Sequence, residues 1–165
     1  MPLTNALAPD RAAPAGPPPE IAEDLVEIDT RFGRFVYPRA NTIEMPQGVL
    51  GFANFHQFAL LTLPDQRFSQ FRLLQCASEP ALSFLVVPAA LEGCGIDRAD
   101  LDEALQALGF AAADTVLLLI VTIRKIEGRA DITVNMRAPI VLDARRQIAR
   151  QYVLSNNKYS IRQRL

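Results

Sequence analysis

The chain has 165 residues, a length typical of one domain, and half of them are hydrophobic, so it can bury one sizeable core. A formal net charge of -1 and a pI near 5.8 give no long-range field that would attract nucleic acid or an anionic membrane. The longest apolar run, residues 116–121, is far shorter than the about 20 residues of a membrane-spanning helix. Because residues 1–10 also lack the pattern of a secretory signal, we expect a cytoplasmic protein that does not enter a membrane.

The N-terminal segment, residues 1–24, is rich in proline and alanine, with the run AAPAGPPP at residues 12–19. Proline lacks a backbone donor, and the segment offers no apolar face that would offset the entropy of ordering it. We therefore predict a flexible leader with a bias toward polyproline II geometry, followed by one folded domain over residues 25–165. The leader is interpreted as an inert extension, and a ligand for a proline-binding partner is the alternative.

Short strands dominate the predicted domain. Apolar and acidic side chains alternate at residues 26–30, and alternation resumes at residues 34–37 after a turn, which predicts a hairpin. Pro46 and Gly48 suit the second and fourth positions of a type I turn, and residues 53–57 are expected to form one helical turn. Further strands are predicted at residues 42–45, 58–63, 71–76, 82–87, 116–123, 132–137, 140–143 and 147–154.

One longer helix is predicted between residue 97 or 100 and residue 109. It has an apolar stripe of leucine and alanine, Asp100 and Glu103 at the spacing of a capping box, and Gly109 where a C-terminal cap belongs. We count about nine strands and find neither a repeat nor an alternating β-α-β pattern. The sequence therefore predicts a mainly β fold, a small antiparallel β-barrel-like domain with one or two short helices.

The sequence shows no set of residues typical of catalysis or of metal binding. His56 is the only histidine, whereas a histidine-based metal site recruits further ligands at close spacing. Neither the G-x-S-x-G motif of serine hydrolases nor a glycine-rich phosphate-binding loop occurs. The adjacent carboxylates Asp102 and Glu103 are interpreted as a solvated helix face. We predict that the protein is not an enzyme and uses no cofactor.

The C-terminal third is basic, because Asp143 is its only acidic side chain after residue 136 and Tyr152 and Tyr159 lie among the cations. Cations at strand edges protect a sheet from aggregation, and this interpretation is preferred. A surface for an acidic protein ranks second and a nucleic-acid-binding surface third. The cations are Arg137, Arg145, Arg146, Arg150, Lys158, Arg162 and Arg164.

Several strings occur in an order that is informative when they are taken together. They are T-R-F-G at residues 30–33, M-P-Q-G-V-L-G-F at 45–52, F-A-L-L at 58–61, I-V-T-I at 120–123, T-V-N-M-R-A-P-I-V at 133–141, Q-Y-V-L at 151–154 and Y-S-I-R at 159–162. This succession resembles the flagellar assembly factor FliW family from about residue 26 to the end of the chain. The block at residues 133–141 is the most specific of the seven.

The resemblance implies a compact β-barrel-like fold without catalysis. It implies two protein partners, flagellin and the RNA-binding translational repressor CsrA. Binding of CsrA keeps it from flagellin mRNA, and flagellin in turn occupies the factor until it is exported, so that synthesis is coupled to export. No direct contact with nucleic acid and none with a membrane is expected. The alternative is a regulatory module that binds nucleic acid through the basic C-terminal third.

Partner contacts are predicted mainly within the matching strings. The predicted contact residues are Glu27, Asp29, Pro46, Gly48, Phe52, Asn135 and Arg162. Because CsrA proteins are basic, an acidic surface would complement them. One candidate surface lies beside the first strand (Glu23, Asp24, Glu27 and Asp29), and the other lies on the helix (Asp97, Asp100, Asp102 and Glu103). Alternatively, the residues at 46–52 shape a loop, and Asn135 satisfies backbone groups at a strand crossing.

Overall fold

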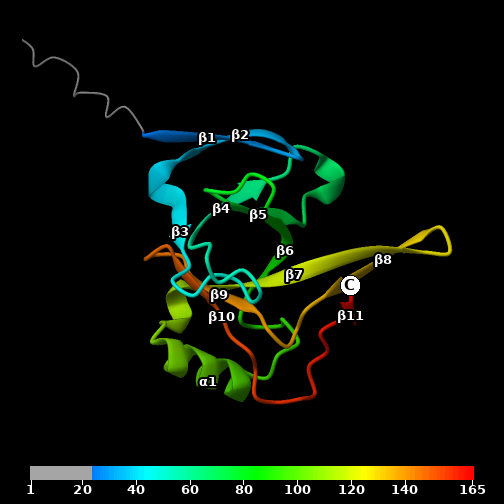
Figure 1. The fold of residues 1–165 in the computed structure, drawn as a ribbon. Coiled ribbons are helices and arrows are strands. Elements are labelled where there is room, and N and C mark those ends of the chain that lie inside the picture. The colour runs from blue at the N-terminus through cyan, green and yellow to red at the C-terminus, as the bar shows by residue number, and fades with distance from the viewer. Residues whose placement is uncertain (1–23) are drawn as a thin grey trace, which may run out of the picture.

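A computed structural model describes residues 24–165, and Figure 1 shows how their elements are arranged. The strands are β1 (Leu25–Thr30), β2 (Gly33–Pro38), β3 (Thr42–Glu44), β4 (Gln57–Thr62), β5 (Arg72–Cys76), β6 (Ser83–Ala89), β7 (Thr115–Ile126), β8 (Arg129–Val134), β9 (Ile140–Asp143), β10 (Ile148–Gln151) and β11 (Gln163–Arg164). The helix α1 spans Arg98–Leu108, and single 3₁₀ turns occur at Arg39–Asn41, Gln66–Phe68 and Ala112–Asp114. The predicted mainly β fold is confirmed.

Seven strands close into a barrel. In the order β7-β6-β5-β4-β3-β10-β9 each strand pairs with the next, and β9 pairs back onto β7 (Figure 1). Every pair in this ring is antiparallel except β10 with β3, which is joined by the single bridge between Ile148 and Glu44. The antiparallel barrel-like prediction is therefore confirmed, with one thin parallel seam.

Strand β7 lies between two apolar clusters, which explains its continuous hydrophobic run. Alternate side chains of a strand point to opposite faces. Leu118 belongs to the barrel interior with Phe58 and Leu74, whereas Leu117 and Leu119 belong to the cluster that α1 covers. The amphipathic stripe of α1 packs on the second cluster through its buried residues Leu101, Ala104 and Leu105.

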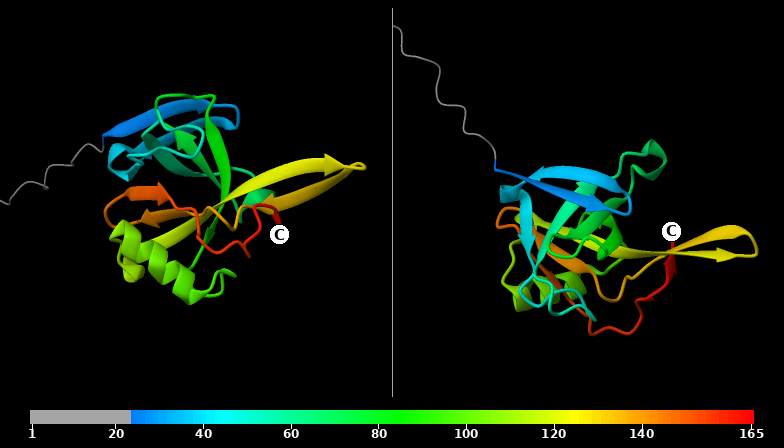
Figure 2. Two further views of the ribbon diagram at one scale, coloured as in Figure 1. Left: turned by 60° about the horizontal axis from the view of Figure 1, so that its bottom comes forward. Right: turned by 45° about the horizontal axis from the view of Figure 1, so that its top comes forward.

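Two hairpins extend beyond the barrel. The hairpin β1–β2 packs across β4 and β5, where Ile28 and Tyr37 bury against Ala59, Leu61 and Leu73. The second hairpin is the end of β7 with the start of β8, and it projects from the barrel as an arm (Figure 2). Residues 122–130 of this arm are exposed. Strand β11 pairs with the outer edge of β8.

Two local predictions are wrong. Residues 53–57 do not form a helical turn, because the Met45 N–H binds the His56 carbonyl at 2.7 Å and Gln57 already begins β4. The predicted capping box at Asp100 does not form either. Asp97 is the N-cap residue without a side-chain capping bond, and the Asp100 carboxylate accepts from Tyr159 instead. The predicted C-cap is confirmed, since Gly109 has φ +68°.

Candidate docking site

Strands β6 and β7 part from one another at one end of the barrel. Their ladder ends at the pair Val86 and Ile120. Beyond that pair, β6 continues beside β5, while β7 continues into the arm beside β8. The divergence leaves a space that side chains line.

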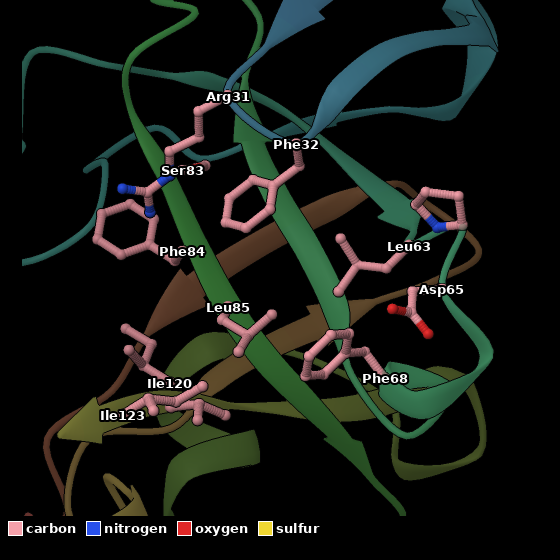
Figure 3. Close-up of a pocket in the computed structure, with 12 residues that line it drawn as sticks. Arg31, Phe32, Leu63, Asp65, Phe68, Ser83, Phe84, Leu85, Ile120 and Ile123 are labelled. Atoms are coloured by element: carbon pink, nitrogen blue, oxygen red, sulfur yellow. The ribbon is translucent and has the colours of Figure 1, made fainter. Parts of the chain in front are cut away.

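A groove of about 480 Å³ lies at this divergence (Figure 3). Three separate segments supply its aromatic rings: Phe32 comes from the β1–β2 turn, Phe68 from the 3₁₀ turn after β4, and Phe84 from β6. Figure 3 shows the side chains of Phe32, Phe68 and Leu85 turned toward the same space. We call this site the aromatic groove and define it by the apolar side chains of Phe32, Leu63, Phe68, Phe84, Leu85 and Ile123.

The aromatic groove leaves large apolar side chains in contact with water. Phe32 and Phe68 are each 40% exposed, and Ile123 is 49% exposed. Scattered exposed hydrophobic residues are ordinary, but a concave cluster of them marks an interaction site. The groove is therefore the best candidate on the described surface for docking another molecule.

Charged side chains at the rim of the groove hold two of its aromatic rings. The Arg31 guanidinium lies 4.8 Å from the centre of the Phe32 ring, and that of Arg67 lies 5.9 Å from the Phe68 ring. Arg67 also forms an ion pair with Asp65 at 2.6 Å, and its hydrogen bonds hold the pKa of that carboxyl below the usual value. Asp65 is thus engaged at the rim, whereas Arg31 has no ion pair among residues 24–165.

Of the predicted contact residues in the turn after β3, one reaches the groove. Phe52 packs edge-on against the groove residue Phe84 with ring centres 5.3 Å apart, and it is 39% exposed. Gly48 shapes the turn, since its N–H donates to the Met45 carbonyl at 2.8 Å and its φ is +62°. Pro46 is exposed in the same turn and does not line the groove.

The other predicted contact residues lie away from the aromatic groove. Glu27 and Asp29 share one partner on the β1–β2 hairpin, because Arg34 forms ion pairs with them at 2.7 and 2.9 Å. The hydrogen bond from Arg34 lowers the pKa of Asp29. Asn135 accepts two backbone N–H groups through Oδ1, from Arg137 at 3.1 Å and Ala138 at 3.0 Å, which is the structural role considered for it. Arg162 is exposed just before β11.

Sequence reasoning missed Phe32, Phe68 and Ile123 as site residues. A signal was present for the two aromatic residues. Phe32 stands in a predicted turn, and Phe68 stands between polar residues after a strand stop, where an apolar side chain has no core to join. Ile123 gave no signal, because it reads as the end of a buried strand.

The two candidate acidic surfaces differ in net charge. The hairpin region carries the described carboxylates Asp24, Glu27 and Asp29 and the cations Arg31, Arg34 and Arg39, a net of zero, and Arg34 and Arg39 form its ion pairs. On α1, the four carboxylates face two cations, a net of -2; the carboxylates are Asp97, Asp100, Asp102 and Glu103, and the cations are Arg98 and Lys158. Among the described residues, the acidic character that the sequence indicated persists on α1 and not on the hairpin, and the fourth predicted carboxylate of the hairpin surface, Glu23, lies outside the described residues.

Within residues 24–165, no cluster of three or more histidine, cysteine or acidic side chains is arranged to hold a metal ion. No helix in that part of the chain has the length and hydrophobicity needed to cross a membrane. A closed barrel, an exposed apolar groove and an acidic helix are typical of proteins that dock other molecules on their surface.

Comparison with known proteins places the chain within one family. A family model described as FliW protein matches residues 27–165. The flagellar assembly factor FliW of Geotalea uraniireducens strain Rf4 is 39% identical over 134 residues, which cover 81% of this chain and 79% of that protein. The corresponding protein of Geobacter sulfurreducens is 34% identical over 134 residues, 79% of this chain and 80% of its own length.

A solved structure gives the same result. The crystal structure of the flagellar assembly factor FliW superposes with a TM-score of 0.67 at 29% identity and covers 84% of this chain and 96% of that one. The chain therefore belongs to the FliW family of flagellar assembly factors, and the resemblance found in its sequence is confirmed. The relatives are named for assembly of the flagellum and not for a catalysed reaction.

Proposed function

We propose that this chain acts in the cytoplasm as a non-catalytic adaptor that binds flagellin and a CsrA-type translational repressor. Binding of the repressor frees flagellin mRNA for translation, and accumulated flagellin displaces the repressor, which couples flagellin synthesis to export. The observation that carries the proposal is the family match across residues 27–165. The exposed aromatic groove supports it, since a docking protein needs an unfilled apolar surface.

The charge on α1 supports docking of the repressor there. CsrA proteins are basic, and opposite potentials steer association and favour the correct partner. The helix retains a net charge of -2 after its own ion pairs are counted, and Asp102 on it is exposed. The aromatic groove would then be the surface that binds flagellin. Two surfaces then require that one ligand disfavours the other through a coupling free energy of about 1–3 kcal/mol.

Calorimetry tests the proposal. Purified flagellin and CsrA are each titrated into the full chain, and CsrA is then titrated into the flagellin complex. We expect both complexes to form, and flagellin to weaken CsrA binding between about 5-fold and 150-fold. Absence of both complexes would contradict the proposal.

A matched pair of variants locates the repressor surface. Asp102→Lys on α1 should weaken CsrA binding, and more so at low salt, because exposed charges are less screened there. Asp29→Lys on the neutral hairpin makes the same charge change and should leave CsrA binding close to that of the unmodified chain. Equal weakening by the two variants would count against α1 as the surface.

The nucleic-acid alternative gains no support from the arrangement of the basic C-terminal third. Four of its cations form ion pairs within 4 Å: Arg145 with Asp114, Arg146 with Asp143, Lys158 with Asp97 and Arg164 with Asp131. Carboxylates beside cations oppose contact with phosphate, so a continuous basic track is interrupted. The preferred interpretation, protection of strand edges, agrees with β11, where Arg164 lies at the outer edge of the sheet.

A further inference from the structure

The arm has one strand edge that no described strand covers. Residues 121–126 of β7 pair with β8 on one side, and the ladder to β6 on the other side stops at Ile120. Within residues 24–165 no other strand pairs with β7 beyond that point. The edge is open over the stretch that borders the aromatic groove, to which Ile123 contributes its side chain.

The register of the arm shows which backbone groups face the open edge. The Asn135 N–H donates to the Ile120 carbonyl at 2.9 Å, so the pair Val121 and Val134 is of the non-hydrogen-bonded kind. The pairs Ile123 with Ile132 and Lys125 with Ala130 lie two and four residues further along, so they are also of the non-hydrogen-bonded kind. The N–H and C=O groups of Ile123 and Lys125 therefore point away from β8 and along the open edge. An extended peptide beside β7 could therefore form hydrogen bonds with these groups at the regular spacing of an antiparallel or parallel sheet.

The groove supplies pockets for the side chains of such a peptide. An added strand directs every second side chain to one face. Phe32, Phe68 and Leu85, which are turned toward the same space, offer apolar surface to the side chains of that face. Backbone bonds to an edge and pockets for alternate side chains are together the mode of recognition called β-augmentation.

The charges around the open edge indicate the chemistry of the added strand. Among residues 24–165, Arg31, Arg124, Lys125 and Arg129 form no ion pair within 4 Å. Asp131 is occupied by Arg164 at 3.2 Å, which leaves Glu127 as the carboxylate of the turn. The edge is thus basic, and a strand that carries Asp or Glu complements it.

The same observations disfavour two other occupants. The proline run at residues 17–19 is unsuited to an added strand, since proline has no N–H to donate. A second copy of the chain paired through the same edge would bring Arg124 and Lys125 of one β7 close to those of the other, and like charges that face each other across strands are destabilising.

We infer that the open edge of β7, together with the aromatic groove, binds an extended segment of a protein partner by β-augmentation, and that this segment alternates apolar with other side chains and carries carboxylates. The inference deepens the proposed function and rests on it in one respect, that the partner is a protein. It assigns the groove a backbone-directed mode of binding, which a helical partner would not use.

Selection from a displayed library of random peptides of about ten residues, long enough for an ordinary strand, tests the inference on the full chain. We expect the enriched peptides to alternate apolar residues with a period of two, to include Asp or Glu and to lack proline. Synthetic copies should protect the amides of Ile123 and Lys125 from hydrogen exchange. Enrichment of apolar residues at helical spacing, of proline-rich peptides or of nothing at all would overturn the inference.

A matched pair of variants isolates the backbone bond. Ile123→Pro removes the N–H that faces the open edge but leaves the ladder bonds to β8 in place. Ile123→Val keeps the N–H as well as the ladder bonds. A selected peptide should bind the proline variant about tenfold more weakly than the valine variant, the effect of one lost hydrogen bond. Equal affinities, with folding checked by circular dichroism, would contradict β-augmentation. If the proline variant does not fold, the hydrogen-exchange result decides.

Two further measurements separate this inference from its rivals and from the proposed function. Sedimentation of the chain alone should show a monomer, and a dimer that Ile123→Pro abolishes would mean that a second copy occupies the edge. Failure of the unmodified chain to bind flagellin and CsrA refutes the proposed function, whatever peptides are selected. Binding of both proteins without protection of Ile123 and Lys125 by a selected peptide refutes only the inference.

Discussion

In the turn after β3, the backbone of residues 52 and 53 passes close to Gly48. A Cβ at this position would lie 2.4 Å from the Phe52 carbonyl oxygen, and the φ of +62° is unfavourable for any side chain. Gly48→Ala should therefore lower the free energy of unfolding by about 3 kcal/mol, as measured by urea denaturation. Gly51→Ala is the control, because Gly51 has φ +86° with open space around it, and its loss should be about 1 kcal/mol. Equal losses of unfolding free energy in the two variants would mean that the close contact with the Phe52 carbonyl does not destabilise Gly48→Ala.

Tyr159 links the C-terminal segment to the start of α1. Its buried hydroxyl accepts the Asp97 N–H at 2.9 Å and donates to the Asp100 carboxylate. Tyr159→Phe leaves both groups without this partner, so the free energy of unfolding at pH 7 should fall by about 1–3 kcal/mol. Urea denaturation at neutral pH measures the loss, and an unchanged midpoint would contradict it.

Alkaline pH gives a second test of Tyr159. Burial, followed by the bond to Asp100, raises the pKa of the phenol above its ordinary value of 10.0. The folded state thus favours the neutral phenol, and this stability is fully present below pH 10 and lost as pH rises through the folded pKa. The phenylalanine variant should consequently lose less stability than the unmodified chain between neutral pH and the alkaline range above 10. Parallel losses would show that Tyr159 does not titrate with unfolding.

At the scale of elements, the β1–β2 hairpin tests whether the outer strands belong to the core. Ile28 is buried against the barrel, whereas Val36 on the neighbouring strand is 56% exposed. Ile28→Ala should lower the free energy of unfolding by about 2–4 kcal/mol, because it removes buried methyl groups and leaves a cavity. Val36→Ala removes a similar group from water and should change stability by less than about 0.5 kcal/mol. If the hairpin did not contribute to stability, the two variants would have the same free energy of unfolding.

The elements that alternation or an amphipathic stripe defines were predictable from the sequence. The hairpin of β1 and β2 and the helix α1 were placed nearly correctly, since each has one face that must be buried. Elements that are held only by pairing with a neighbouring strand were not predictable from the sequence. The sequence predicted that the strand ends at residue 123, yet β7 continues to Ile126 because β8 pairs with its polar end. The two-residue strand β11 was missed for the same reason.

At the scale of the whole molecule, the candidate site could not be read from the sequence. Phe32, Phe68, Phe84 and Ile123 are far apart in the chain, and they meet only because the barrel closes and β6 and β7 then diverge. Long-range pairing decides that divergence, and no local pattern records it. The residues that stood out in the sequence, Gly48 and Asn135, prove to hold turns, since local conformational needs leave a clear mark in sequence.

The boundary of the folded domain is a property of the whole chain and is open to a sharp test. The sequence predicts a folded domain over residues 25–165, and we propose that Asp24 belongs to it as well, because the Asp24 carbonyl accepts the Arg39 N–H at 2.7 Å. A chain that lacks residues 1–23 should keep its melting temperature within about 2 °C and bind the same selected peptides. Removal of Asp24 as well should lower the melting temperature by about 2–4 °C, since one backbone bond is lost and the exposed ion pair with Arg39 adds little. A loss of stability already at the first truncation would show that residues 1–23 contribute to the fold, and the domain boundary would then have to move toward the N-terminus.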